Sequence, residues 1–210
     1  MQECLNKGVD VNTTTAGNTC LHLAVFQPKP GLIKLLLEKG VDAELGNDRG
    51  NTALHIASRK GFADVILFLL EYGVDKDKKN KNEEPALYTA AELNHVQVTK
   101  QLLRFKASTT EKRKGFTPLL KAIKEQNNGV AELLIKQGAN VNEQIGIGHA
   151  TSSLVQNLPI FKQLLKNDLD INTNFISGET YLTTGIKLGN SDFTEFLIEN
   201  GGPIIIDDNK

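Results

Sequence analysis

The chain lacks tryptophan and has only two cysteines among its 210 residues. Aromatic side chains make up 6% of the sequence, so no aromatic platform for stacking bases or sugars is visible. Cys4 and Cys20 are too few for a disulfide framework, which favours a reducing compartment. We therefore expect a cytoplasmic protein, with the nucleus as an alternative.

Excess charge and long apolar runs are also missing. The 24 basic side chains are balanced by 25 acidic ones, so there is no global attraction to nucleic acid or membranes. The longest apolar runs, such as Val65 to Leu70, are far shorter than the roughly 20 residues of a membrane-spanning helix. The opening residues MQECLNKGVDVN show no basic-then-apolar signal region. We expect no nucleic-acid partner and no membrane insertion.

Internal repetition is what the sequence has instead. NTALHIASRKG, Asn51 to Gly61, repeats the frame of NTCLHLAVFQP, Asn18 to Pro28. One column recurs at Thr19, Thr52, Pro85, Thr117 and Thr180. A second column, at intervals of 32, 33, 33, 32, 30 and 33 residues, consists of Gly8, Gly40, Gly73, Lys106, Gly138, Asp168 and Gly201. Two columns in register predict stacked structural repeats.

These residues resemble the ankyrin repeat family, whose units open with T-P-L-H-x-A and close with L-L-x-x-G-A-D-x-N. The nearest copies of the opening are TALHIA, Thr52 to Ala57, and TPL, Thr117 to Leu119. The resemblance covers nearly the whole chain. It implies an all-α fold, an ankyrin-repeat solenoid of stacked helix-turn-helix units joined by β-hairpin loops.

We expect a single array over residues 1–210. Its expected parts are an incomplete N-terminal repeat (1–15), repeats at 16–48, 49–81, 82–113 and 114–145, a divergent repeat (146–175), and a C-terminal repeat and cap (176–210). Because Met1 to Lys7 supply only the tail of a helix, we expect further repeats upstream in a longer protein. Ile204 to Ile206 are expected to fold back as a cap, or to lead into another domain.

The residue types suit this fold. The Thr that opens a unit offers a hydroxyl to the free amides at a helix start. Pro118 suits a first helical turn because its missing N–H would be unpaired there. Gly61 and Gly189 are expected where a helix ends in a left-handed residue.

The divergent repeat departs most from this pattern. Counting back from Asp168 places Ile147 in the Thr column and His149 in the column of the core Leu. Two interpretations stay open: drift that the stack tolerates, or a soft joint at which the array opens locally.

No set of residues predicts catalysis. His22 and His55 occupy matching positions, where the resemblance implies structural hydrogen bonds, and no Cys or carboxylate cluster completes a metal site. Nothing in the sequence assembles a base and an oxyanion site around either cysteine. We expect no catalytic residues, no metal site and no cofactor, and therefore not an enzyme.

Two charged stretches, Asp75 to Glu84 and Glu111 to Gly115, are expected at consecutive hairpin tips. Their cations are Lys76, Lys78, Lys79, Lys81, Lys112, Arg113 and Lys114. They are either solvated loops or a basic patch that attracts an acidic partner surface.

The resemblance implies that the concave face and the hairpin tips bind a partner protein. The partner-binding residues carried over are Phe26, Arg49, Arg59, Lys60, Lys81, Glu92, Leu93, Lys112, Arg113, Phe116, Glu125 and Phe175. Phe26, Phe116 and Phe175 are candidate aromatic anchors, although each could instead fill a gap in the packing.

We therefore expect a monomeric protein–protein interaction module, a scaffold or targeting segment. The alternatives are an inhibitor that occludes a partner enzyme, a substrate-presenting array of a larger enzyme, or a secreted bacterial effector acting in a host cytosol. The sequence does not separate them.

Overall fold

The computed structural model describes residues 12, 14–142, 149–173, 175 and 178–202. Over these residues it contains twelve helices and one two-stranded sheet. The chain forms two compact units, Met1–Pro118 and Leu119–Lys210, here called unit 1 and unit 2. The expectations for Met1 to Lys7, Gly8, Ile147 and Ile204 to Ile206 lie outside the described residues.

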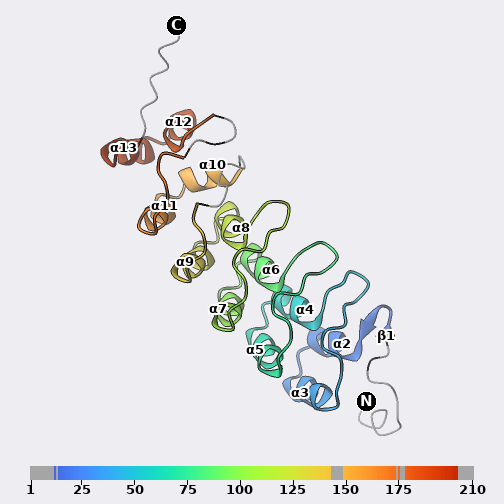
Figure 1. Cartoon of the computed structure of the whole chain (residues 1–210). Helices are drawn as coiled ribbons and strands as arrows, with labels where there is room; N and C mark the ends of the chain where they lie inside the picture. The colour runs from blue at the N-terminus through green and yellow to red at the C-terminus, as the bar shows by residue number, and fades with distance from the viewer. Residues whose placement is uncertain (1–11, 13, 143–148, 174, 176–177, 203–210) are drawn as a thin grey trace. The chain divides into compact units, whose positions relative to one another are not determined.

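Unit 1 is built from three helix pairs in two layers (Figure 1). The first helices are α2 (Cys20–Phe26), α4 (Ala53–Lys60) and α6 (Ala86–Glu92), and the second helices are α3 (Pro30–Glu38), α5 (Ala63–Tyr72) and α7 (Val96–Arg104). Each helix packs against its equivalent in the neighbouring pair. The core lies between the layers, where Leu21, Leu54 and Leu87 are at most 2% exposed.

Unit 2 repeats the arrangement. Its first helices are α8 (Pro118–Lys124, whose first residue ends unit 1), α10 (His149–Val155) and α12 (Tyr181–Lys187), and its second helices are α9 (Asn128–Lys136), α11 (Leu158–Leu165) and α13 (Ser191–Glu199). Aromatic rings fill its core: the centroid of Phe161 lies 5.0 Å from that of Tyr181 and 4.7 Å from that of Phe193, both edge to face. The sequence prediction of an all-α array of stacked helix pairs joined by hairpin loops is confirmed.

Threonine and proline begin the first helices as predicted. Thr19, Thr52 and Thr180 stand at the N-caps of α2, α4 and α12, each in a capping box in which the side chain accepts the N–H of the third helical residue. Pro118 is the first residue of α8. These helix starts satisfy amides that would otherwise be unpaired.

Helix ends are defined by backbone conformation. Gly61 and Gly73 follow α4 and α5 in the left-handed region, with φ of 77° and 95°. Lys106 and Asp168, which replace glycine in the second column, have φ of 63° and 65°. The column therefore marks a left-handed residue at every described position, whether or not it is glycine.

The hairpins join consecutive helix pairs. Strand β1 (Thr14–Thr15) pairs antiparallel with β2 (Asn18–Thr19), and both turn residues between them have positive φ, as a tight hairpin turn requires. Isolated antiparallel bridges join Lys79 to Pro85 and Arg113 to Phe116 in the hairpins that precede α6 and α8.

The divergent repeat is one residue shorter between its two helices. Helix α10 begins 9 residues before α11 (158 − 149), whereas α4 begins 10 residues before α5 (63 − 53). The core Leu of the other repeats is the second residue of the first helix, which in α10 is Ala150. The placement of His149 in the core-Leu column stays a prediction, because the side chains of residues 149 and 150 lie outside those that the structure describes.

None of the described helices is both long enough and apolar enough to span a lipid bilayer. The division of the chain into repeats at the stated residues stays a prediction.

Candidate protein-binding surface

A hollow of about 340 Å³ lies in unit 1 between the hairpins and helices α2 and α4. Four of the predicted partner-binding residues line it: Phe26, Arg49, Arg59 and Lys60. Phe26 ends α2, Arg49 lies in a hairpin, and Arg59 and Lys60 end α4. The structure therefore brings together residues that are up to 34 positions apart (60 − 26).

Phe26 is the exposed aromatic side chain of this surface. Helix α2 buries Leu21, Ala24 and Val25, so the helical repeat turns Leu23 and Phe26 outward, each 43% exposed. An apolar ring that is open to water at the edge of a hollow is the kind of feature that anchors a protein interface.

An asparagine ladder fixes the hairpins beside the hollow. The Asn47 amide donates to Asn18 Oδ1 over 3.3 Å, and the Asn80 amide donates to Asn51 Oδ1 over 2.7 Å. Asn47 Oδ1 also accepts the backbone N–H groups of Arg49 and Asn51 at 3.0 and 3.1 Å. These bonds hold the backbone of each tip, from which the Arg49 side chain extends into solvent.

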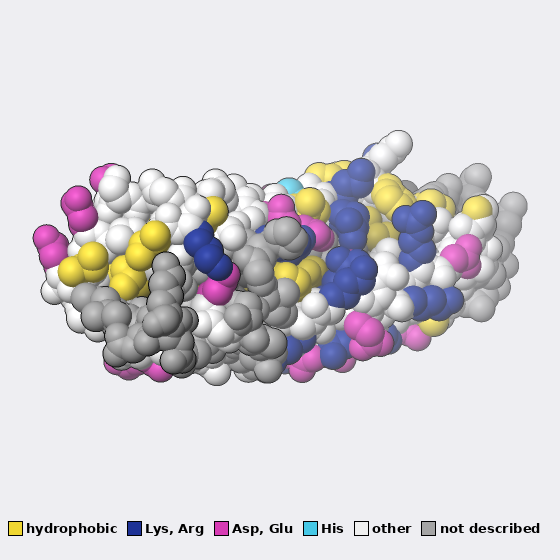
Figure 2. Space-filling model, turned by 90° about the horizontal axis from the view of Figure 1, so that it is seen from above, with side chains coloured by type: hydrophobic (Ala, Val, Ile, Leu, Met, Phe, Trp, Pro, Cys, Tyr) yellow, Lys and Arg dark blue, Asp and Glu magenta, His cyan; other side chains and the backbone are white. Residues whose placement is uncertain are grey.

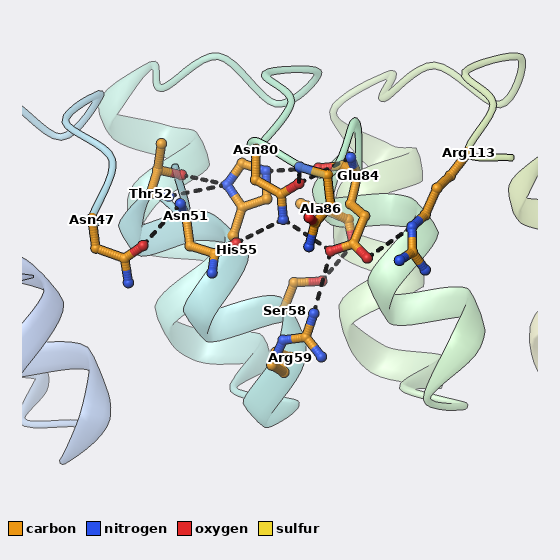
Figure 3. A network of polar contacts seen from close by, with 11 residues as sticks. Asn47, Asn51, Thr52, His55, Ser58, Arg59, Asn80, Glu84, Ala86 and Arg113 are labelled. Atoms are coloured by element: carbon orange, nitrogen blue, oxygen red, sulfur yellow. Dashed lines mark hydrogen bonds and ion pairs between the residues drawn. The ribbon is translucent and has the colours of Figure 1, made fainter. Parts of the chain in front are cut away.

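Two histidines tie each helix start to the next hairpin (Figure 3). His55 Nδ1 accepts the Thr52 N–H at 3.2 Å, so its proton is on Nε2, which donates to the Glu84 carbonyl at 3.0 Å. His22 bonds the Thr19 N–H and the Asn51 carbonyl in the same way, at 3.0 and 2.7 Å. The prediction that both histidines are structural is confirmed.

The surroundings of both rings favour the neutral form. Burial lowers the pKa of His22 and of His55 below the ordinary value of 6.5, although the backbone carbonyl that each ring bonds acts in the opposite direction. A neutral ring is also what the hydrogen bonds require, because only an unprotonated Nδ1 accepts an N–H.

Glu84 is a buried carboxylate that sequence reasoning missed (Figure 3). It is 3% exposed, and its Oε1 lies 3.0 Å from Arg113 Nε. Its Oε2 accepts from the Asn80 amide at 2.9 Å and lies 3.4 Å from Arg59 Nη2. The repeat could have indicated its burial. Glu84 directly precedes Pro85, as Asn51 directly precedes Thr52, and the backbone carbonyl at this position accepts a hydrogen bond from a histidine.

The predicted basic patch is interleaved with carboxylates. At least four of its seven cations form ion pairs: Lys76 with Asp77 (3.2 Å), Lys78 with Glu44 (3.4 Å), Lys79 with Glu111 (2.6 Å) and Arg113 with Glu84 (3.0 Å). The hydrogen bond that Lys79 donates to the Glu111 carboxylate raises the pKa of Lys79. This stretch is therefore a mixed-charge surface rather than a patch of unpaired positive charge.

The remaining predicted residues are placed in different surroundings. In unit 1, Lys81, Leu93 and Lys112 are exposed, and Glu92, Phe116 and Arg113 are half-buried. In unit 2, Glu125 is exposed and pairs with Lys121 at 2.7 Å.

Phe175 is not the exposed anchor that its place among the partner-binding residues implied; the alternative, that its ring fills a gap in the packing, is what the structure shows. Its side chain is 7% exposed, and its ring lies edge to face with that of Tyr181, with centroids 5.0 Å apart. Phe175 thus joins the aromatic core of unit 2, where burial of the ring is more favourable than exposure to water.

Paired helices, left-handed helix ends and capping histidines define a helical repeat protein of the kind that presents an extended surface. A family model described as ankyrin repeats in three copies matches residues 1–80 and 73–145. The chain belongs to the ankyrin repeat family. Ankyrin repeats are general protein–protein interaction modules, and the fold itself is non-catalytic.

Among solved structures, the chain is similar to the ankyrin repeat domain of Bcl-3, described as a unique member of the IkappaB protein family. The two are 25% identical, the match covers 87% of this chain and 85% of that one, and the TM-score is 0.79. Among curated proteins, none matches the sequence.

Proposed function

We propose that the chain is a scaffold or targeting segment that binds a partner protein at the hollow of unit 1. The observation that carries this proposal is the meeting of an exposed aromatic ring, Phe26, with Arg49, Arg59 and Lys60 around one concavity. Aromatic and arginine side chains supply most of the binding energy at protein interfaces. Figure 2 shows Lys and Arg side chains gathered beside hydrophobic ones on part of one face.

The scaffold beneath the hollow favours binding because it is already ordered. The hairpin that carries Arg49 is held by Asn47, and the start of α4 is held by His55. A surface that is ordered before binding loses less conformational entropy when the partner docks.

The hollow is the centre of a larger contact. A stable interface buries about 800 Å² on each partner, more than a cavity of this size supplies. Lys81 and Leu93 are exposed on the same unit, and Leu93 is 40% exposed. We assign these residues to the rim.

Affinity capture with a hollow variant tests the proposal. Phe26→Ala combined with Arg49→Ala should lose partners that the wild-type chain captures, while its thermal unfolding midpoint stays within a few degrees of the wild type. A matched control, Lys39→Ala combined with Lys100→Ala, changes two exposed lysines outside the lining of the hollow and should retain those partners. Retention of every partner by the hollow variant would show that the surface lies elsewhere.

If a captured partner is an enzyme, assay of its activity distinguishes a scaffold or targeting segment from an inhibitor. A scaffold or targeting segment leaves the activity of the partner unchanged when purified chain is added. An inhibitor lowers that activity in proportion to occupancy of the hollow, and the hollow variant then fails to lower it.

A further inference from the structure

We propose that the hollow binds an acidic peptide segment of the partner, in which an Asp or Glu side chain lies next to an apolar side chain. This inference rests on the proposed function, because it names the chemistry of the partner at the same surface.

The charges that line the hollow are mainly positive. Three cations, Arg49, Arg59 and Lys60, face one anion, Asp48, which leaves a formal charge of +2 (3 − 1). The Asp48 carboxylate is turned toward the preceding hairpin, because a Cβ built on Gly17 would lie 2.3 Å from its Cγ. The anion of the lining therefore sits against another hairpin.

Two of these cations are not neutralised. Among the described residues, neither Arg49 nor Lys60 forms an ion pair. Arg59 shares the Glu84 carboxylate with Arg113, so that carboxylate is already used within the unit. Lys81, whose N–H donates to the Arg49 carbonyl at 3.1 Å, extends the positive edge.

An unpaired amide donor accompanies the cations. Asn51 lines the hollow, and its Oδ1 accepts from Asn80. Its Nδ2 has no hydrogen-bond partner within the described part of the chain, and Figure 3 shows this nitrogen pointing away from the Asn80 amide. Arg49, Lys60 and the Asn51 amide thus offer donors at the hollow, and an ionised carboxylate is the side chain that only accepts.

The apolar requirement comes from the same lining. The Phe26 ring is 43% exposed and Ile56, also in the lining, is 6% exposed, so an apolar side chain placed here would remove the ring from water. A nucleic acid supplies phosphate but no aliphatic side chain, and the chain as a whole carries a net charge of −1. An acidic and apolar peptide matches both halves of the lining.

Selection from a phage-displayed random peptide library tests the inference on the full chain. Enriched peptides should carry Asp or Glu beside Leu, Ile, Val or Phe. In fluorescence anisotropy, their affinity should fall roughly tenfold or more on Arg49→Glu with Lys60→Glu, because attraction becomes repulsion. Affinity for the wild type should also weaken as salt is raised.

Two control variants distinguish loss of the hollow's charges from a change in net charge or in folding. Lys39→Glu with Lys100→Glu makes the same change of net charge on two lysines that do not line the hollow and should change affinity by less than about twofold, since its electrostatic effect is long-range and screened. If the charge reversal lowers the helicity of the chain, Arg49→Ala with Lys60→Ala replaces it and should still weaken binding.

Several outcomes would overturn the inference: no enriched peptide, enriched peptides without acidic residues, or full affinity for the charge-reversed chain. Binding of oligothymidylate as tight as that of the selected peptides would identify a general polyanion site instead. If partner proteins are lost on Phe26→Ala yet retained on charge reversal, the proposed function stands and only the acidic partner is rejected.

Discussion

Lys106 and Asp168 show how single residues meet the demands of the repeat. Both stand in a column otherwise occupied by glycine, and both have a left-handed backbone, with φ of 63° and 65°. A side chain with a Cβ is strained there by about 1 to 2 kcal/mol. The fold tolerates this strain because the neighbouring helix pairs hold the helix ends in place.

Lys106→Gly is therefore expected to stabilise unit 1. Relief of the left-handed strain exceeds the extra entropy of glycine in the unfolded chain, for a net gain of about 0.5 to 1 kcal/mol in the free energy of unfolding. Urea denaturation followed by circular dichroism measures the change. Lys39→Gly is the control: Lys39 has φ of −84°, so glycine there should lower the stability. A loss of stability on Lys106→Gly would contradict the argument.

The buried histidines make stability depend on pH. Because burial lowers the folded-state pKa of His22 and His55, the unfolded chain binds more protons than the folded chain below about pH 7. The free energy of unfolding should fall as the pH drops through 6.5 toward the lowered folded pKa values. Urea midpoints at successive pH values measure this fall.

His55→Gln separates the histidine contribution from that of the carboxylates. It removes one proton-binding group, so stability should fall less steeply between pH 7 and pH 5 than in the wild type. It should also lower stability at pH 7 by about 1 to 2 kcal/mol, because the bonds to Thr52 and the Glu84 carbonyl are lost or weakened. A pH dependence identical to the wild type would contradict the assignment.

At the scale of elements, Glu84 links three consecutive structural pieces of unit 1. Its carboxylate contacts Arg59 at the end of α4, Asn80 in its own hairpin and Arg113 in the next hairpin. Arg113 also lies over the Tyr88 ring of α6, 5.8 Å from its centroid. Helix pairs are thus coupled by polar contacts as well as by apolar packing.

Glu84→Ala should weaken the coupling between α4 and the two hairpins, and so lower the free energy of unfolding. It leaves the buried Asn80 amide short of a partner and removes the shared anion from Arg59 and Arg113, for an expected loss of about 2 kcal/mol. Glu38→Ala is the control, since Glu38 is exposed and pairs only at 3.9 Å with Lys34, so its effect should stay within about 0.5 kcal/mol. Equal effects of the two substitutions would show that Glu84 is not a link.

At the scale of the whole molecule, a repeat protein has a stability close to the sum of its repeats and their nearest-neighbour contacts. Helix α10 in unit 2 has Ala150 as its second residue, where the first helices of the other repeats carry the core Leu. Other α10 side chains still pack well, since Leu154 and Val155 are fully buried. Both interpretations of the divergent repeat, tolerated drift and a soft joint, are therefore open to measurement.

The soft-joint hypothesis makes a prediction for hydrogen exchange. Amides of α10 should exchange faster than those of α4, because weaker coupling lets the helix pair open without global unfolding. Mass spectrometry of peptides covering the two helices measures the rates. Equal protection in α10 and α4 would favour drift that the stack tolerates.

The candidate site shows where prediction from sequence ends. Phe26, Arg49, Arg59 and Lys60 could be named in advance because the resemblance to ankyrin repeats implies binding at hairpin tips and first helices, which the repeat places at known intervals. For Phe175 the sequence left an anchor and a packing role both open, since its burial depends on Tyr181 and the rings around it.

The sequence by itself determined the repeat and the helix starts at Thr52 and Pro118, and its resemblance to ankyrin repeats implied the structural role of His55. These features are local and periodic, so they follow from residues within one turn of a helix or at a fixed interval. Only the tertiary structure decided that Glu84 is shared by Arg59 and Arg113, and which cations of the hollow stay unpaired. Such pairings join residues some 25 to 30 positions apart (84 − 59 and 113 − 84), and they depend on where neighbouring repeats bring their side chains together.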